Sequence, residues 1–272
     1  MPDDPTRYWQ SMTTVEAAAA VERDPVLIWP LAATEQHGPH LPLSTDLDIG
    51  MGLLAGAFRN LPKDFPAWVL PPQAVGASSE HARFHGTLSL STEQLVRTVE
   101  EQGAALARTG VRRLVLSNSH GGNLHAMDAA GLWLRKEHGM LVVKASYFQF
   151  DRPDSVGLPD SEWRHGLHGG AVETAMMLHL RPGRVRTDEV SDIRSLGAEL
   201  EQTMRRLGPQ GQASFSWLAE DLHPTGVAGD ARLANASMGE RLVAHYARAL
   251  ADVILDARDF QLDRLTRVQM SG

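Results

Sequence analysis

The sequence predicts an α/β protein whose strands form a mainly parallel sheet. Short apolar runs at 26–31, 114–117 and 141–143 have the length of buried strands, and helical patterns lie between them. The run at 114–117 passes directly into a glycine-rich turn and then into a helical stretch. This order is typical of the βαβ units of parallel sheets. With 272 residues, 43% of them hydrophobic, the chain can bury a sizeable core.

Local signals place the other elements in chain order. Thr13 and Glu16 form a capping box before a helix at 14–23, and Ser91 and Gln94 form a second one before a helix that Gly110 ends. Ser237 is expected to cap the last helix. The remaining predictions are a helix from Asp46 to Leu61, a strand at 68–70, a loop at 76–87, a helix up to His138, a helix from Ala171 to Arg181, a charged solvent-facing segment at 183–207 and a loop at 217–230.

Composition excludes several classes of function. A formal net charge of -7 disfavours a nucleic-acid surface, because phosphate binding needs clustered Lys and Arg. The chain has no cysteine, so any metal must be held by His, Asp or Glu. No glycine-rich nucleotide motif is present. No apolar run is long enough for a membrane span and the N-terminus does not resemble a signal peptide, so we expect a cytoplasmic protein.

Glu35, His37 and Asp46 follow the first predicted strand. Residues two apart in an extended segment point the same way, so Glu35 and His37 can converge on one point just past the strand end. Gly38 and Pro39 then turn the chain, and Asp46 can return to that point. The carboxyl ends of strands are where open α/β sheets bind ligands. The pattern is compatible with a metal site and equally with a polar loop that ends in an N-cap Asp.

Two later segments carry similar residues. His120 lies at the carboxyl end of the strand at 114–117, before Gly121 and Gly122, and is either a site residue or an ordinary loop histidine. His168 precedes the helix that begins at Ala171. Glu173 falls in the first turn of this helix, where the helix dipole favours a carboxylate, so helix capping alone would explain it.

Together these segments resemble the creatininase family, creatinine amidohydrolase and its relatives. The resemblance covers most of the chain, from about residue 30 to residue 235. It implies a single domain, 1–272, folded as a three-layer α/β/α sandwich around a mainly parallel sheet. The matching segments are Glu35-Gln-His37-Gly-Pro-His-Leu-Pro-Leu-Ser-Thr-Asp46, Glu80-His81-x-x-Phe84-x-Gly86-Thr87, Asn118-Ser-His120-Gly-Gly-Asn123, His168-Gly-Gly-x-x-Glu173-Thr174 and Gly226-Val-x-Gly229-Asp230.

The resemblance implies two divalent ions per chain, zinc or manganese. Its ligands map onto Glu35, His37, Asp46 and His120, with Asp46 as the bridging carboxylate. Creatininase carries a further carboxylate two residues beyond the histidine of the third segment, where this chain has Gly122. We therefore assign the fifth ligand to Glu173.

The family mechanism would be hydrolysis by a hydroxide that bridges the two ions. His168 is the expected proton shuttle to the leaving nitrogen. Glu80 and Asn123 are expected to line the site, although Asn123 would serve equally well as a helix cap.

Three readings of the function are open. The first, from the resemblance, is cleavage of a C–N bond in a cyclic amide or formamide by a metal-dependent amidohydrolase. The second, also from the resemblance, is another kind of hydrolase, either one that opens the ring of an oxidised cyclitol or lactone-like substrate or a peptidase of cofactor maturation. The third is a metal-binding protein without activity. Family members form hexamers, so we expect a homohexamer that acts on a small molecule.

Creatinine itself is not the expected substrate. Creatininase builds its creatinine pocket with aromatic residues, including a Tyr directly after the histidine of the third segment. Gly121 occupies that position here, and Trp163 is the aromatic residue that would supply a wall instead.

Overall fold

The computed structural model describes residues 7–266. Four parallel strands form the central sheet in the order β2-β1-β3-β4. Its strands are Ala67–Val69 (β2), Val26–Leu31 (β1), Arg113–Asn118 (β3) and Leu141–Ser146 (β4). The main helices are Thr14–Val21 (α1), Thr45–Asn60 (α2), Thr92–Arg108 (α3), Leu124–His138 (α4), Asp160–His165 (α5), Ala171–Leu180 (α6), Leu196–Thr203 (α7), Ala219–Leu222 (α8) and Ala236–Asp259 (α9).

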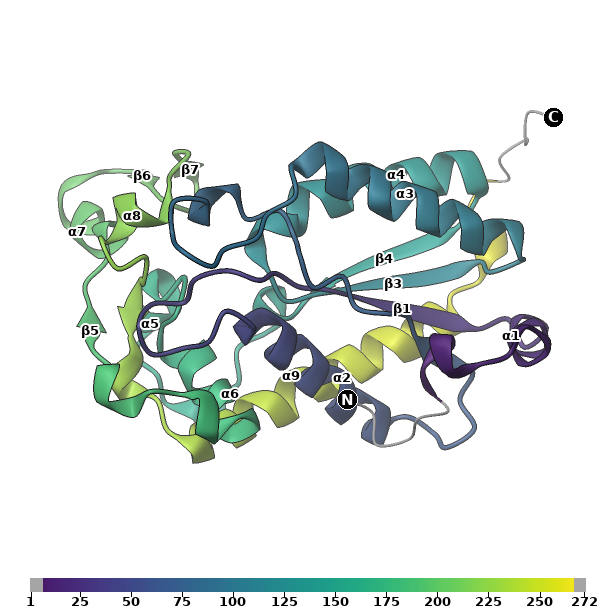
Figure 1. Ribbon diagram of the computed structural model, residues 1–272, viewed down its shortest axis with the longest axis horizontal. Coiled ribbons are helices and arrows are strands. Elements are labelled where there is room, and N and C mark those ends of the chain that lie inside the picture. The colour runs from purple at the N-terminus through teal and green to yellow at the C-terminus, as the bar shows by residue number, and fades with distance from the viewer. Residues whose placement is uncertain (1–6, 267–272) are drawn as a thin grey trace.

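Helices cover both faces of the sheet, which confirms the predicted three-layer sandwich. In Figure 1, α3 and α4 lie on one face, and α2 and α9 lie on the other. The alternating side chains of β1 enter two separate cores: Val26 and Ile28 pack toward α2, α6 and α9, while Leu27 and Trp29 pack toward α3 and α4. Burial on both faces explains why this strand is a continuous apolar run.

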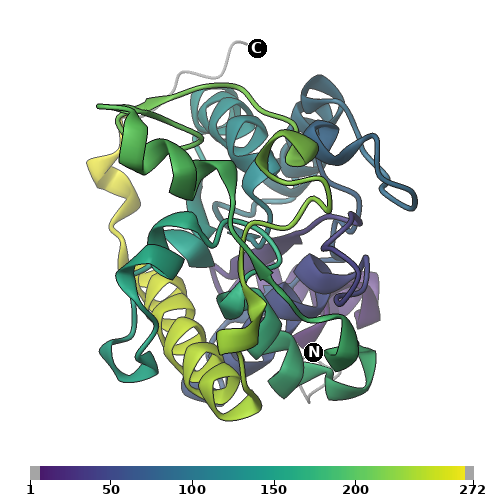
Figure 2. The same cartoon turned by 90° about the vertical axis from the view of Figure 1, so that its left-hand side faces the viewer.

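Short strands join the segments beyond β4. They form two small pairs outside the central sheet, one antiparallel and one parallel: Asp192–Ile193 (β5) with Gly229–Asp230 (β8), and Leu207–Gly208 (β6) with Ala213–Ser214 (β7). Figure 2 views this end of the molecule, where the carboxyl ends of the sheet strands also lie.

The local predictions are largely confirmed, with corrections at three places. Both capping boxes form, at Thr13 and at Ser91. The last helix begins earlier than predicted, because the side chain of Asn235, and not that of Ser237, accepts from the N–H of Met238 at 2.9 Å. The predicted loop at 217–230 contains α8 and β8, and the short helix α5 was not predicted. The prediction that the N-terminus is not a signal peptide concerns residues outside the described range.

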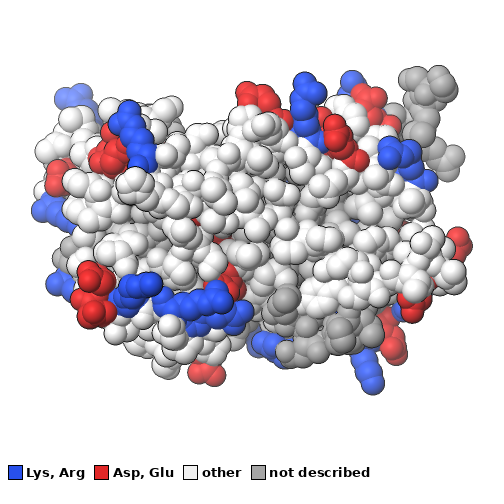
Figure 3. Space-filling model, in the orientation of Figure 1, with Lys and Arg blue, Asp and Glu red and all other residues white. Residues whose placement is uncertain are grey.

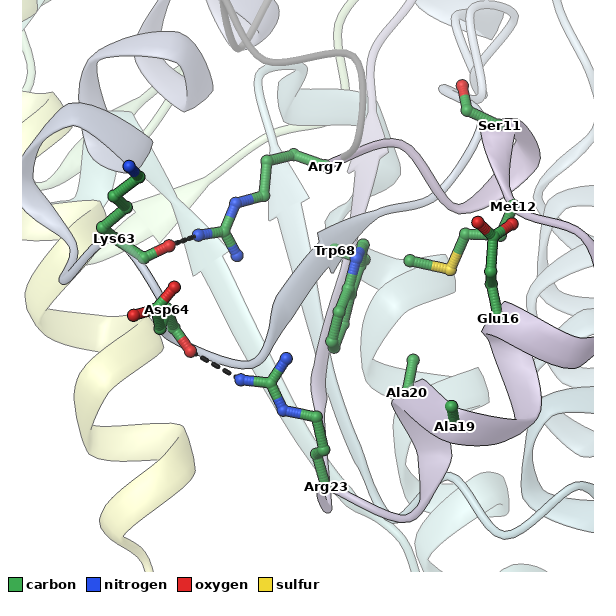
Figure 4. Close-up of a pocket in the computed structure, with 10 residues that line it drawn as sticks. All are labelled: Arg7, Ser11, Met12, Glu16, Ala19, Ala20, Arg23, Lys63, Asp64 and Trp68. Carbon is green, nitrogen blue, oxygen red and sulfur yellow. Dashed lines mark hydrogen bonds between the residues drawn. The ribbon is translucent and has the colours of Figure 1, made fainter.

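A hollow of about 460 Å³ lies between α1 and the segment before β2 (Figure 4). Arg7 donates to the carbonyl oxygen of Phe65 at 2.6 Å, and Arg23 donates to that of Asp64 at 2.7 Å. The guanidinium of Arg23 also lies over the ring of Trp68 at 5.7 Å. These basic side chains therefore hold the N-terminal part of the chain against β2.

Figure 3 shows basic and acidic side chains interspersed near the edges of one face of the molecule. None of the helices between residues 7 and 266 combines the length and the apolar character that a membrane crossing needs.

Candidate metal centre

Five predicted ligands meet at the carboxyl end of the sheet. Glu35 and His37 follow β1, and Gly38 turns the chain there with a left-handed φ of +72°. Asp46 lies in the first turn of α2 and Glu173 in the first turn of α6. His120 follows β3 after one intervening residue, Ser119.

Asp46 stands at the centre of the cluster. Its Oδ1 is 3.3 Å from His37 Nε2, and its Oδ2 is 3.3 Å from His120 Nδ1. Glu35 Oε1 lies 3.2 Å from the same His120 nitrogen, whereas Glu173 Oε1 lies 4.0 Å from His37 Nε2. The atoms thus form two sets that share Asp46, one completed by Glu35 and His120 and the other by His37 and Glu173.

These atoms fit divalent cations. Both carboxylate oxygens of Glu35, the Nε2 of His37 and the Oδ2 of Asp46 are buried without a hydrogen-bond partner. Buried polar atoms are rarely left unpaired, and buried carboxylates that are not bound to metals or cations are costly. In each histidine, the ring nitrogen that faces away from the cluster makes a hydrogen bond that fixes the orientation of the ring. His37 Nδ1 donates to the carbonyl oxygen of Glu35 at 3.1 Å, and His120 Nε2 donates to that of Ala77 at 2.9 Å. Such backing contacts are typical of metal-binding histidines.

Electrostatics inside the cluster favour positive charge. Burial opposes protonation of His37, yet the carboxylates of Asp46 and Glu173 raise the pKa of His37 to about 9. His120 behaves similarly: burial works against its charge, and Glu35 and Asp46 raise its pKa well above the usual value. A metal ion would displace these protons, since histidine ligands must be deprotonated.

Glu173 both caps the start of α6 and faces the ligand cluster. Its Oε2 accepts from the backbone N–H of Gly169 at 2.6 Å, near the start of α6, and its Oε1 faces His37. The capping contact fixes the carboxylate, and Oε1, which also accepts from the hydroxyl of Tyr147 at 3.5 Å, faces the cluster.

His168 lies beside the cluster, 8% exposed. Its Nε2 donates to the carbonyl oxygen of Gln36 at 2.6 Å, so in the neutral ring Nδ1 is unprotonated. This Nδ1 is 3.8 Å from Glu35 Oε1. The ring lies between those of His37 and His81, tilted by 34° and 33° with centroid distances of 4.1 and 4.3 Å. Burial together with the neighbouring His37 lowers the pKa of His168.

Glu80 and Asn123 differ in position. Glu80 lines the cavity above the cluster, with its Oε1 3.7 Å from His120 Nε2. Asn123 does not line that cavity, contrary to expectation, and although it occupies the N-cap position of α4, its side chain makes no capping hydrogen bond. Its buried amide accepts from Ala77 N at 3.0 Å and donates to the carbonyl oxygen of Ala32 at 3.2 Å. Asn123 therefore supports the loops behind the cluster, and its predicted place beside the substrate is corrected.

The two glycines after His120 have different surroundings. A Cβ on Gly122 would lie 2.1 Å from the carbonyl oxygen of Ala77 and 2.6 Å from Glu80 Oε1. Position 122 therefore has no room for a side chain. A Cβ on Gly121 would meet nothing within 4 Å, and this residue lines the cavity.

The cavity has a volume of about 800 Å³. The cluster lies on one side of it, and aromatic side chains provide much of the rest of the wall. The aromatic lining residues are Tyr147, Phe148, Phe150, Trp163, Trp217 and Tyr246. Trp163 lines the cavity as the sequence predicted; Trp217 comes from the segment after β7, which carried no recognisable signal.

His81 and Gln36 were not assigned roles from the sequence. His81 is buried, and its Nε2 is 3.5 Å from Glu35 Oε1. Burial, with a contribution from the adjacent His168, lowers the pKa of His81 to about 3, so the ring is neutral. The sequence signal that could have revealed a role for His81 was its position in the segment Glu80–Thr87, one of the segments that carry the family resemblance.

Comparison with known proteins accounts for this arrangement. Residues 10–254 match the family described as "Creatininase: Creatinine amidohydrolase". The chain is 35% identical over 232 residues to the mycofactocin precursor peptide peptidase of Mycolicibacterium smegmatis, which covers 85% of this chain and 84% of that protein.

Solved structures agree with this match. A crystal structure of creatinine amidohydrolase superimposes with a TM-score of 0.75 at 27% identity, covering 95% of this chain and 100% of that one. A structure described as a manganese creatininase gives 0.73 at 28% identity, covering 92% and 98%. The chain therefore belongs to the creatininase family and is a hydrolase.

Proposed function

We propose that this hydrolase uses two divalent metal ions to cleave an amide bond in a peptide. The observation that carries the proposal is the shared Asp46 carboxylate, which joins two sets of buried, unpaired ligand atoms at an open cavity. The peptidase of M. smegmatis, which is similar over most of its length, supports a peptide substrate rather than the cyclic amide or formamide that the sequence first suggested.

One ion would be held by Glu35, Asp46 and His120, and the other by His37, Asp46 and Glu173. Zinc and manganese both accept such nitrogen and oxygen ligands. When bound, the pair supplies Lewis-acid polarisation of the scissile carbonyl and an activated water.

His168 would handle the proton. Because its Nε2 is committed to a backbone carbonyl, the free Nδ1 can take a proton from the attacking water and return it to the leaving nitrogen. Contacts with the imidazole rings on either side, those of His37 and His81, hold the ring in one orientation during both transfers. Glu80, on the cavity wall, is placed to accept a hydrogen bond from a substrate N–H.

The cavity favours a substrate larger than creatinine. Its volume of about 800 Å³ is in the range of pockets that enclose drug-sized ligands. Gly121 leaves the floor open beside His120, and the aromatic wall would bind apolar side chains of a peptide.

We also propose a cytoplasmic homohexamer, on family grounds. The segment around Glu80–Thr87 is the proposed contact, and Leu43 and Leu88 beside it are 37% and 55% exposed. Light scattering at micromolar concentration should give six times the chain mass. A monomer would contradict the assembly.

The function is tested on zinc- and manganese-loaded protein with a panel of short synthetic peptides, formamides, lactones and creatinine. Mass spectrometry should find two peptide fragments whose masses sum to that of the substrate plus one water. Chelation and Glu35→Gln should abolish this product, and His179→Ala, at an exposed residue near the end of α6, should not. Turnover of creatinine with no cleavage of any peptide would refute the peptidase assignment.

A further inference from the structure

Three of the segments that define the family resemblance meet behind Glu35. We propose that His81 is a positioning residue that holds the Glu35 carboxylate, and that Gln36 sets the tautomer of the His81 ring. The inference rests on the proposed function in one respect, namely that Glu35 binds a metal ion. It assigns a role to the segment Glu80–Thr87 and to Gly226.

The amide of Gln36 has only one orientation that satisfies its neighbours. Its Oε1 accepts from the N–H of Gly38 at 2.9 Å, and its Nε2 donates to the carbonyl oxygen of Gly226 at 3.1 Å. A flipped amide would place an oxygen against that carbonyl and an NH₂ group against an N–H. Gln36 Nε2 is therefore the donor to His81 Nδ1, which lies 2.8 Å away.

Gly226 makes room for this amide. Its φ of +73° is in the left-handed region, and a Cβ there would lie 2.4 Å from Gln36 Nε2. The backbone N–H of Gln36 donates to Thr87 Oγ1 at 3.2 Å, which joins the same residue to the loop that carries His81. The three segments are thus locked together at one buried side chain.

The tautomer of His81 follows from these contacts. Because Nδ1 accepts from Gln36, the proton of the neutral ring is on Nε2, which lies 3.5 Å from Glu35 Oε1. This separation exceeds a normal hydrogen bond, so the N–H attracts the carboxylate as a dipole and leaves its oxygen lone pairs available. Neither His81 nitrogen then has a free lone pair for a metal, whereas His168 keeps a free Nδ1.

The first test is spectroscopic and uses the full-length, metal-free protein. Long-range ¹H–¹⁵N NMR correlations distinguish the two neutral tautomers of each imidazole, and the signals of His81 are those missing from His81→Gln. We expect the Nε2–H form in the wild type and a mixture of both forms in Gln36→Met, which lacks the amide donor. An Nδ1–H form or a doubly protonated ring in the wild type would overturn the inference.

The second test titrates zinc into the metal-free protein by calorimetry. His81→Leu removes the N–H and should weaken zinc binding about 10–100-fold, the usual effect of losing a contact that orients a metal ligand. His81→Gln, whose amide can still donate toward Glu35, should restore most of the affinity. His179→Leu, at an exposed residue near the end of α6 and outside the proposed subunit contact, is the matched control and should bind as the wild type does.

The two failures are distinguishable. Zinc binding by the wild type with unchanged affinity in His81→Leu would refute the positioning role alone. A wild type that binds no zinc would refute the metal centre and the positioning role with it, and the NMR experiment would still decide whether Gln36 sets the tautomer.

Discussion

Removing the shared carboxylate should empty both metal sites, whereas removing His120 should empty only one. Asp46 is 2% exposed and directs one oxygen to each set of ligands, at 3.3 Å from His37 Nε2 and 3.3 Å from His120 Nδ1. His120 approaches only the set that contains Glu35. Elemental analysis should therefore find close to two ions per wild-type chain, one in His120→Ala and none in Asp46→Ala.

The thermal stability should follow the same pattern. An ion present at about 100 times its dissociation constant stabilises the folded state by about 2.7 kcal/mol, so two ions contribute about 5 kcal/mol. For a domain near this size, 1 kcal/mol shifts Tm by about 2–4 °C, which gives about 5–11 °C for one ion and about 10–20 °C for both.

Scanning calorimetry with and without a chelator measures this difference in each variant. The chelator should lower the Tm of the wild type by the full amount, that of His120→Ala by about half of it, and that of Asp46→Ala not at all. His179→Ala, at an exposed residue, should match the wild type. An Asp46→Ala protein that keeps one ion, together with a His120→Ala protein that loses both, would show that Asp46 is not the shared ligand.

Three further predictions concern the cavity. His168→Ala should keep both ions and lose roughly 10²–10⁴-fold in kcat. If this variant loses an ion while Glu173→Ala keeps both, then His168 is the metal ligand and Glu173 the proton shuttle. In urea unfolding, Gly122→Ala should lower the free energy of unfolding by about 1–3 kcal/mol, because the added Cβ meets the carbonyl oxygen of Ala77. Gly121→Ala, whose Cβ would have nothing within 4 Å, should have the same free energy of unfolding as the wild type. The value of kcat/KM on creatinine should be at least about 10²-fold below that on the true substrate, a barrier difference near 2.7 kcal/mol; efficient hydrolysis, on the order of 10⁴ M⁻¹s⁻¹, would refute the argument from Gly121.

Much of this protein could be predicted from the sequence because the relevant interactions are local. The apolar run of β1 and the capping boxes at Thr13 and Ser91 each depend on neighbouring residues. The convergence of Glu35 and His37 was also predictable, since the geometry of an extended segment brings residues two apart to the same side. That Asp46 joins them in a metal centre was an expectation from the family resemblance.

The tertiary structure decided what depends on contacts between distant segments. Glu173 can face His37 only because α6 packs beside α2, and Asn123 turns to the loops behind the cluster because Ala32 and Ala77 present backbone groups there. Which nitrogen of His168 is free follows from a single bond to the carbonyl oxygen of Gln36, 132 positions earlier in the chain. The sequence determines which donors and acceptors are present. Hydrogen bonds are short and directional, so only the folded arrangement determines which donor pairs with which acceptor.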